Sequence, residues 1–169
     1  MVVHMFVLGV DPGVSRCGYC VLEARTTGPA PVALGVLTTS PADPIHQRLA
    51  ELQAELRALI AEFHPEALAV ERVLFSVNVR TAMSVGQASG IAMAEAATAG
   101  CDVVQYSPNQ VKEAVAGYGG ASKEQVQLMV QTLLGLDEIP RPPDAADAAA
   151  VALCHLAMAP VRAAYGAGQ

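Results

Sequence analysis

Three apolar segments separated by turn residues open the chain, and they constrain its fold more than any other feature. They span residues 5–10, 17–23 and 32–38, and the gaps between them contain Pro12-Gly13 and Gly28-Pro29. Such short strand-like segments with turn residues between them favour an antiparallel arrangement, because parallel neighbours need a long crossover. The sequence therefore predicts a three-stranded antiparallel meander at the start of the fold.

Helical and strand-like patterns alternate over the rest of the chain. Leucines recur at helical spacing between residues 44 and 64, and Pro65 ends that pattern. Helices that alternate with strands build parallel strand pairs, so we expect an α/β fold with a mixed five-stranded sheet flanked by helices. The expected elements are a helix over 44–64, a strand over 67–70, a helix over 79–99 and a strand over 103–106. Three helices follow: one from Ser107 to just before Gly117, one from Ser122 to about residue 134, and one from Asp144 to about Ala159.

The composition is that of one folded domain. The 169 residues suffice for a full core, and we expect a domain over residues 1–160 followed by a short tail at 161–169. Hydrophobic residues make up 53% of the chain and charged residues 15%, which excludes a disordered protein. We find no apolar run of about 18 residues and no signal-peptide pattern, so we expect a cytoplasmic protein with no membrane partner.

Two of the four cysteines form a C-x-x-C pair, Cys17 and Cys20, which is a spacing used by metal and redox sites. The pair falls in an expected strand, where side chains three residues apart face opposite sides of the sheet. Such side chains cannot share a zinc ion. We interpret Cys17, Cys20, Cys101 and Cys154 as small apolar residues in a reducing compartment.

Four carboxylates stand where strand ends and a helix start can bring them together. Asp11 ends the first strand and Glu71 ends the fourth, and their carboxyl ends meet at one edge if these strands are parallel neighbours. Asp144 and Asp147 are three residues apart and share one helix face. Asp11 as a turn residue, and Asp144 and Asp147 as capping and first-turn acids, are the ordinary alternatives. Glu71 is harder to explain in this way, because a glutamate that ends a buried strand needs a partner.

A two-metal site would account for all four carboxylates. Mg²⁺ (or Mn²⁺) prefers carboxylate oxygens, and two such ions about 4 Å apart activate a water and stabilise the leaving oxygen of a phosphodiester. Four carboxylates without a metal would repel one another strongly. The net charge of −6 argues against binding nucleic acid by charge alone, but setting these four acids aside reduces it to −2. The acidic composition therefore does not exclude a polyanionic substrate.

Two lysines are suited to a phosphate near these acids. Lys112 lies on a helix that follows a strand, and Lys123 opens a helix after the glycine-rich residues 117–120. Backbone N–H groups at a helix start favour phosphate, whereas a cation there opposes the helix dipole, which suggests a role beyond helix stability. The alternative is that both are solvated surface lysines.

Four segments together resemble a known family. In order, they are LGVDPGVSRCGY, AVERVLFSVNVRTAMSVGQASG, SPNQVKEAVAGYGGASKEQVQLMV and PPDAADAAAVALCH, and they extend from about Phe6 to His155. They are similar to the RuvC Holliday-junction resolvases. This resemblance implies a ribonuclease-H-like fold and a structure-selective endonuclease for four-way junction DNA. It implies symmetric nicks in two opposing strands, with 5′-phosphate and 3′-hydroxyl ends.

The resemblance also implies roles for individual residues and partners. Asp11, Glu71, Asp144 and Asp147 would be catalytic and would hold two Mg²⁺ or Mn²⁺ ions, and Lys112 and Lys123 would contact phosphate near the cut. The helix at 79–99 would form a homodimer, and its apolar residues on several sides fit an interface. The RuvA–RuvB branch-migration complex would be a partner, and a short T-containing sequence would be preferred at the cut.

One position departs from the family pattern. The family usually has Phe three residues after the catalytic Glu, in contact with bases near the junction centre. Here that position is Leu74, and Phe75 follows it. Either Leu74 or Phe75 would contact DNA bases, and a satellite core contact is the alternative. Arg72 and Arg80 flank this segment and are candidates for DNA phosphates or for the solvated surface.

Three other functions are the alternatives to a junction resolvase. Actin-like ATPases and sugar kinases share the opening strand, Asp and turn, but they need two such domains, for which 169 residues leave no room. A non-catalytic junction-binding protein would lack one or more of the four acids, and none is missing. A related nuclease that acts on RNA or an RNA–DNA hybrid stays open, because the acids indicate phosphodiester hydrolysis and not a substrate.

Overall fold

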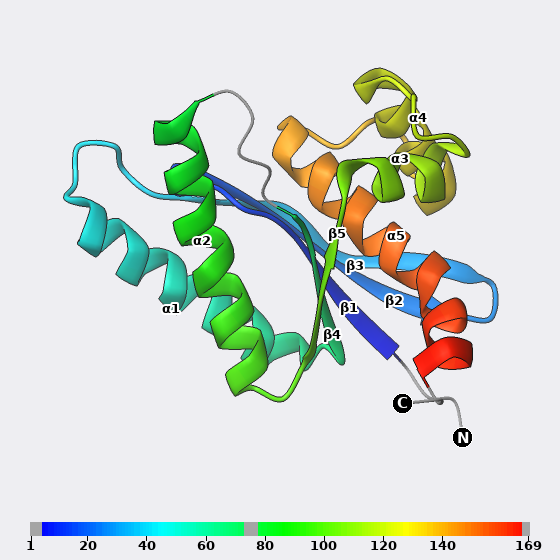
Figure 1. Cartoon of the computed structure of the whole chain (residues 1–169), viewed down its shortest axis with the longest axis horizontal. Coiled ribbons are helices and arrows are strands. Elements are labelled where there is room, and N and C mark those ends of the chain that lie inside the picture. Colours follow the sequence, from blue (N-terminus) through cyan, green and yellow to red (C-terminus); the bar gives the residue numbers. More distant parts are fainter. Residues whose placement is uncertain (1–4, 73–77, 167–169) are drawn as a thin grey trace.

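A computed structural model gives the fold and describes residues 5–72 and 78–166. A mixed five-stranded sheet with the strand order β3-β2-β1-β4-β5 forms its centre (Figure 1). The first three strands are antiparallel, and β4 and β5 continue the sheet in parallel with β1, as predicted. The third strand begins four residues earlier than its apolar pattern suggests. The strands are β1 (Met5–Asp11), β2 (Arg16–Arg25), β3 (Gly28–Thr38), β4 (Ala67–Glu71) and β5 (Asp102–Tyr106).

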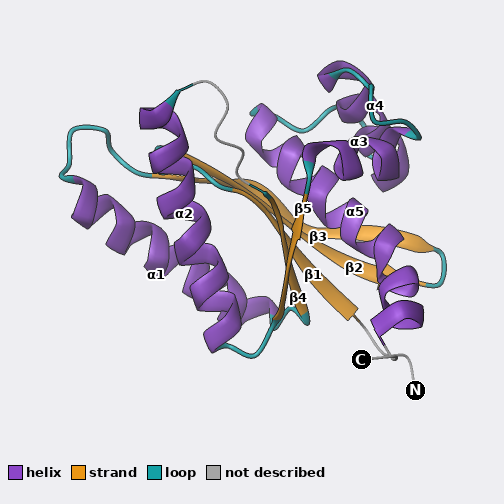
Figure 2. Ribbon diagram, viewed as in Figure 1, coloured by secondary structure: helices purple, strands orange, loops and turns teal. Residues whose placement is uncertain are grey.

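Helices cover both faces of the sheet (Figure 2). One face packs against α1 and α2, and the other packs against α3, α4 and α5, so each face has its own hydrophobic core. Among the described residues, none of the helices combines the length and apolarity needed to cross a membrane. The helices are α1 (Ile45–Phe63), α2 (Val79–Thr98), α3 (Pro108–Ala116), α4 (Lys123–Leu134) and α5 (Pro143–Gly166).

Alternation along the two central strands directs their terminal acids to the same face. Leu8 and Val10 of β1 lie in the core under α1 and α2, whereas Val7 lies in the core under α5. Because successive strand residues alternate between faces, Asp11 shares the α5 face with Val7. The same rule places Glu71 on the face of Ala69, which belongs to the core under α5. Both carboxylates therefore end on the side of the sheet where α5 begins.

Two glycines allow α5 to lie unusually close to the sheet. A Cβ atom at Gly9 would be 2.2 Å from the carbonyl oxygen of Ala148, and one at Gly18 would be 2.0 Å from that of Asp144. Any side chain at these positions would push the helix away. Gly18 pairs with Asp11 across β1 and β2, so the start of α5 lies directly beside the carboxyl end of β1.

The helix starts agree with the sequence, but the last helix is longer than expected. Ser107 and Ser122 form capping boxes with glutamines three residues on, as their spacing predicts. The prediction that the last helix ends near Ala159 is wrong, because α5 continues through Pro160 to Gly166. Proline removes one intrahelical donor, and this loss so near the helix end does not stop the last turns. The helix therefore takes in part of the segment expected as a tail.

The C-x-x-C pair lies on opposite faces of the sheet, as the strand alternation predicts. Cys17 is buried in the core under α1 and α2, and Cys20 is buried in the core under α5. Burial raises the pKa of each thiol to about 12. All four cysteines are free thiols, so none of them forms a disulfide. Cys17 and Cys20 therefore act as buried core residues and not as a shared metal or redox site.

Candidate active site

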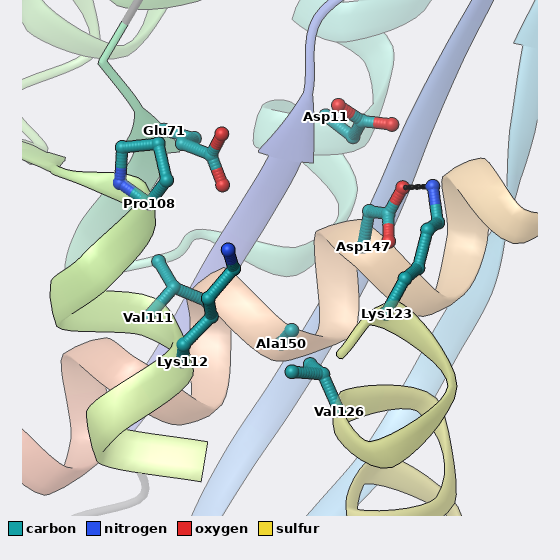
Figure 3. A pocket seen from close by; sticks show the side chains of 9 residues that line it. All are labelled: Asp11, Glu71, Pro108, Val111, Lys112, Lys123, Val126, Asp147 and Ala150. Carbon is teal, nitrogen blue, oxygen red and sulfur yellow. Dashed lines mark hydrogen bonds and ion pairs between the residues drawn. The ribbon is translucent and has the colours of Figure 1, made fainter. Parts of the chain in front are cut away.

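A pocket of about 360 Å³ opens where β1 and β4 end (Figure 3). Three of the four predicted acids and both predicted lysines line it, and they come from β1, β4, α3, α4 and α5. Asp144 does not line this pocket but lies one helical turn before Asp147. The lining residues are Asp11, Glu71, Pro108, Val111, Lys112, Lys123, Val126, Asp147 and Ala150.

Asp11 carries the most perturbed carboxyl group of the pocket. Burial, followed by repulsion from Asp147, Asp144 and Glu71, raises its pKa from 3.8 to about 7, and Lys123 opposes this rise only in part. A carboxylate at the end of a strand is thus held among other carboxylates with too little positive charge nearby. This environment is not that of a turn residue in water, and it favours a bound cation.

Glu71 lies at the rim of the same pocket. The residue as a whole is exposed, but its carboxylate points into the space that it shares with Asp11 (Figure 3). Desolvation and then repulsion from Asp147 raise its pKa, whereas Lys112 and Lys123 lower it. The two lysines therefore offset part of the negative charge of the site.

The two acids of α5 each have a cation partner. The Lys123 ammonium donates to Asp147 Oδ2 at 2.8 Å, which raises the pKa of the lysine (Figure 3). Arg16 Nε lies 3.5 Å from Asp144 Oδ2. Sequence reasoning missed Arg16, and it also missed the close approach at Gly9 and Gly18. The hairpin pairing offered a signal, since Arg16 lies two residues before the partner of Asp11.

The arrangement provides the ligands for a divalent cation but does not close around one. Among the residues described, no three His, Cys, Asp or Glu side chains converge closely enough to hold a metal ion. The donor chemistry fits Mg²⁺ or Mn²⁺, because all the donors are carboxylate oxygens around the undercompensated Asp11.

The residues predicted to bind DNA are only partly described. Arg72 is exposed next to Glu71, and its backbone N–H donates to the Tyr106 carbonyl at 2.7 Å. Arg80 is exposed in the first turn of α2, where Asn78 caps the helix. Leu74 and Phe75 lie outside the described residues. Lys112 and Lys123 are the remaining predicted contacts, and both line the pocket (Figure 3).

Comparison with protein families shows which family this chain belongs to. The model described as "Crossover junction endodeoxyribonuclease RuvC" matches residues 7–155. The chain belongs to the RuvC family. The RuvC of Natranaerobius thermophilus is 48% identical over 151 residues, which cover 89% of this chain and 94% of that protein. The RuvC of a Roseiflexus species is 50% identical over 154 residues, which cover 91% of this chain and 92% of that protein.

Solved RuvC structures have the same fold. Thermus thermophilus RuvC superposes with a TM-score of 0.87 at 39% identity, covering 93% of this chain and 96% of that one. A second structure of that protein, in complex with a Holliday junction substrate, gives 0.88 at 40% identity and covers 94% and 96% of the two chains. The fold is therefore ribonuclease-H-like, as the resemblance implied. All four predicted acids and both lysines fall within the range that the family model matches.

Proposed function

We propose that this protein is an endonuclease that resolves four-way (Holliday) DNA junctions in recombination and repair. It would nick two opposing strands symmetrically by metal-dependent phosphodiester hydrolysis and leave 5′-phosphate and 3′-hydroxyl ends. The observation that carries this proposal is the pocket itself, where Asp11, Glu71 and Asp147 from three separate elements face Lys112 and Lys123. Membership of the RuvC family supports the choice of substrate, because the catalytic acids alone do not specify one.

The acids would hold the metal, and the lysines would hold the phosphate. Asp11, Glu71 and Asp147 would be ligands within the pocket, and Asp144 would join them from one turn earlier on α5. When bound, two Mg²⁺ or Mn²⁺ ions would activate a water and stabilise the leaving oxygen. The Lys123 ammonium pairs with Asp147 in the absence of DNA, and it would donate to a DNA phosphate when the substrate binds. Lys112 would contact the phosphate from the α3 side.

Symmetric cutting needs two such sites, and α2 offers a surface that would bring them together. Along one stripe of α2 the exposed residues are apolar or small, and Val79 and Met83 are 79% and 61% exposed. A Cβ at Gly86 or Gly90 would meet nothing within 4 Å, so a second helix can approach the backbone there. We propose that a homodimer forms through this helix.

The dimer has a direct test with a matched control. Met83→Glu should convert a dimer to a monomer in analytical ultracentrifugation, because it would bury a charge in an apolar contact. Leu128→Glu on α4, where the leucine is 55% exposed, should leave the dimer intact. A wild-type protein that is monomeric at micromolar concentration would exclude this part of the proposal.

Further proposals concern partners, location and sequence preference. The RuvA–RuvB branch-migration complex would deliver junctions to this enzyme, which would act on DNA in the cytoplasm. Leu74 or Phe75 would contact bases near the junction centre, Arg72 and Arg80 would contact phosphates beside them, and cutting would favour a short T-containing sequence. A gel-shift assay with RuvA-bound junction, and cutting of a panel of junction sequences, test these points.

The central experiment compares substrates and metals. A labelled synthetic four-way junction, a linear duplex and an RNA–DNA hybrid are each incubated with the protein in Mg²⁺, Mn²⁺ or EDTA. We expect paired, ligatable nicks in the junction alone, and only when metal is present. Cutting of the hybrid instead would keep the metal-dependent chemistry and assign another substrate. Junction binding without any cutting would indicate a non-catalytic binding protein.

Variants of the acids separate catalysis from binding. Asp11→Asn, Glu71→Gln, Asp144→Asn and Asp147→Asn should each lower cleavage at least about 100-fold while they retain junction binding. Loss of binding in all four variants would show that the acids have a structural role.

A further inference from the structure

Arg48, on the second turn of α1, is held in a fixed position by neutral groups. Its Nε donates to Thr39 Oγ1 at 3.0 Å, and a terminal nitrogen donates to Ser15 Oγ at 2.6 Å. Within the described part of the chain, it forms no ion pair with a carboxylate. Three other described arginines also have no ion pair there, but Arg72, Arg80 and Arg141 are exposed, whereas Arg48 is half-buried. A half-buried guanidinium with an oriented fork and no anion is suited to an anion from outside the chain.

The donors that remain near Arg48 can be counted. A guanidinium has five N–H groups, and the hydrogen bonds to Thr39 and Ser15 leave three for another acceptor. The Thr39 hydroxyl donates to the Val14 carbonyl at 2.6 Å, so its own hydrogen is committed. The Ser15 hydroxyl accepts from Arg48 and is exposed, which leaves its hydrogen available to a ligand. Arg48 and Ser15 together therefore present several convergent donors.

These donors lie beside the catalytic pocket. Ser15 follows Asp11 by four residues, a distance that the chain spans in at most about 14 Å. Arg16, the next residue, pairs with Asp144 of α5 and with Thr38 of β3, so it joins the Arg48 group to the acids. The pocket lies on the face covered by α3, α4 and α5, and α1 lies on the other face (Figure 2). A DNA strand that crosses the sheet edge at Asp11 would meet both.

We propose that Arg48, with the Ser15 hydroxyl and with Arg16 beside them, binds a backbone phosphate of the cleaved DNA strand. Duplex DNA advances about 3.4 Å per nucleotide along each strand, so this phosphate lies within about four nucleotides of the cut. The site would fix the strand relative to Asp11 on the side opposite Lys112 and Lys123. This inference rests on the proposed nuclease function, and it assigns the residues of a contact that the catalytic pocket does not include.

The salt dependence of binding distinguishes this role from simple support of the loop. Junction binding is measured in Ca²⁺ or EDTA at several salt concentrations for wild type and Arg48→Gln. Loss of one phosphate contact should reduce the slope of log K against log salt by about 0.9. Arg57→Gln is the matched control, because Arg57 lies on the same helix but is paired with Glu95. Its slope should equal that of wild type.

A second measurement locates the phosphate. Single uncharged methylphosphonates are placed at each position within four nucleotides of the cut. One position should weaken wild-type binding and have no further effect on Arg48→Gln, whereas Arg25→Gln, at the far end of β2, should behave as wild type. A slope and a methylphosphonate profile that are unchanged in Arg48→Gln would overturn the proposal.

The outcomes also separate this inference from the function on which it rests. If wild type cuts junctions and the Arg48→Gln profile is unchanged, only the phosphate site is refuted. If wild type neither binds nor cuts any DNA, both proposals are refuted. If Arg48→Gln proves misfolded by circular dichroism, Ser15→Ala at an exposed residue serves the same purpose. It should weaken binding at the same methylphosphonate position, and a profile identical to wild type would contradict the proposal.

Discussion

Removal of the Asp11 charge should stabilise the metal-free protein, and the gain should depend on pH. The pKa of Asp11 is raised to about 7 in the folded protein from an ordinary value of 3.8. Between these values the folded protein holds a proton that the unfolded chain has lost, so stability falls as pH rises from 3.8 to about 7 and is level above it. The ionised carboxylate is thus a cost to folding at neutral pH, and Asp11→Asn removes that cost.

The size of the effect follows from the shift. Wild type loses this stability over the two pH units between pH 5 and the folded-state pKa of about 7, and it loses no more between pH 7 and pH 8. At about 1.36 kcal/mol for each unit, the free energy of unfolding falls by at most about 2.7 kcal/mol. Because the pocket is open to water, we expect the stability advantage of Asp11→Asn over wild type to grow by only about 1–2 kcal/mol between pH 5 and pH 8. For a chain of 169 residues this is a difference in Tm of about 2–8 °C.

The assay is thermal unfolding of wild type and Asp11→Asn in EDTA at pH 5 and pH 8. The difference between the two proteins isolates Asp11, because the other titrating groups are shared. The Tm advantage of Asp11→Asn should be larger at pH 8 than at pH 5. Addition of Mg²⁺ at pH 8 should raise the Tm of wild type more than that of the variant, since the cation neutralises the carboxylate. An advantage that is equal at both pH values in EDTA would refute the reasoning.

Three further predictions concern packing and ion pairs. Gly18→Ala should destabilise the protein by at least about 1–3 kcal/mol and reduce cleavage, because the added Cβ would overlap the backbone of α5. Lys123→Met should reduce junction cleavage strongly and change unfolding in urea by less than about 1 kcal/mol, because the ion pair is largely exposed. Arg57→Gln should lower the Tm more at pH 7 than at pH 3. The hydrogen bond from Arg57 lowers the pKa of Glu95 below 4.5. The pair therefore stabilises the fold fully above pH 4.5, and this stabilisation is lost as the pH falls through the lowered pKa.

The part of the fold that follows from local pattern could be predicted from the sequence. Strand alternation placed Cys17 and Cys20 on opposite faces, and the capping residues Ser107 and Ser122 marked two helix starts. The meander and the parallel additions followed from the order and spacing of the elements. Each of these features depends on residues that are close in sequence, so the signal is contained in a short window.

Features that depend on contacts between distant segments could not be predicted in the same way. The close packing of α5 against β1 and β2 requires glycine at positions 9 and 18, because any Cβ there would clash with the helix backbone. A glycine within a strand pattern does not show which segment approaches it. The pairing of Arg16 with Asp144 joins residues 128 positions apart, and only the fold brings them together. The prediction that the last helix ends near Ala159 was wrong, because α5 continues through Pro160, and the context of the helix decides whether the loss of one hydrogen bond ends it.

The charges of the site predict that binding of DNA and binding of a divalent cation are coupled. Lys123 is the partner of Asp147, and it is also one of the two lysines that we propose as contacts of a DNA phosphate. A single ammonium cannot neutralise both groups fully, so a bound phosphate weakens its hold on Asp147 and leaves that carboxylate short of positive charge. Asp11 and Glu71 already lack it, as their raised pKa values indicate. We therefore expect bound DNA to strengthen the binding of a divalent cation at these acids, and by reciprocity the cation to strengthen the binding of DNA.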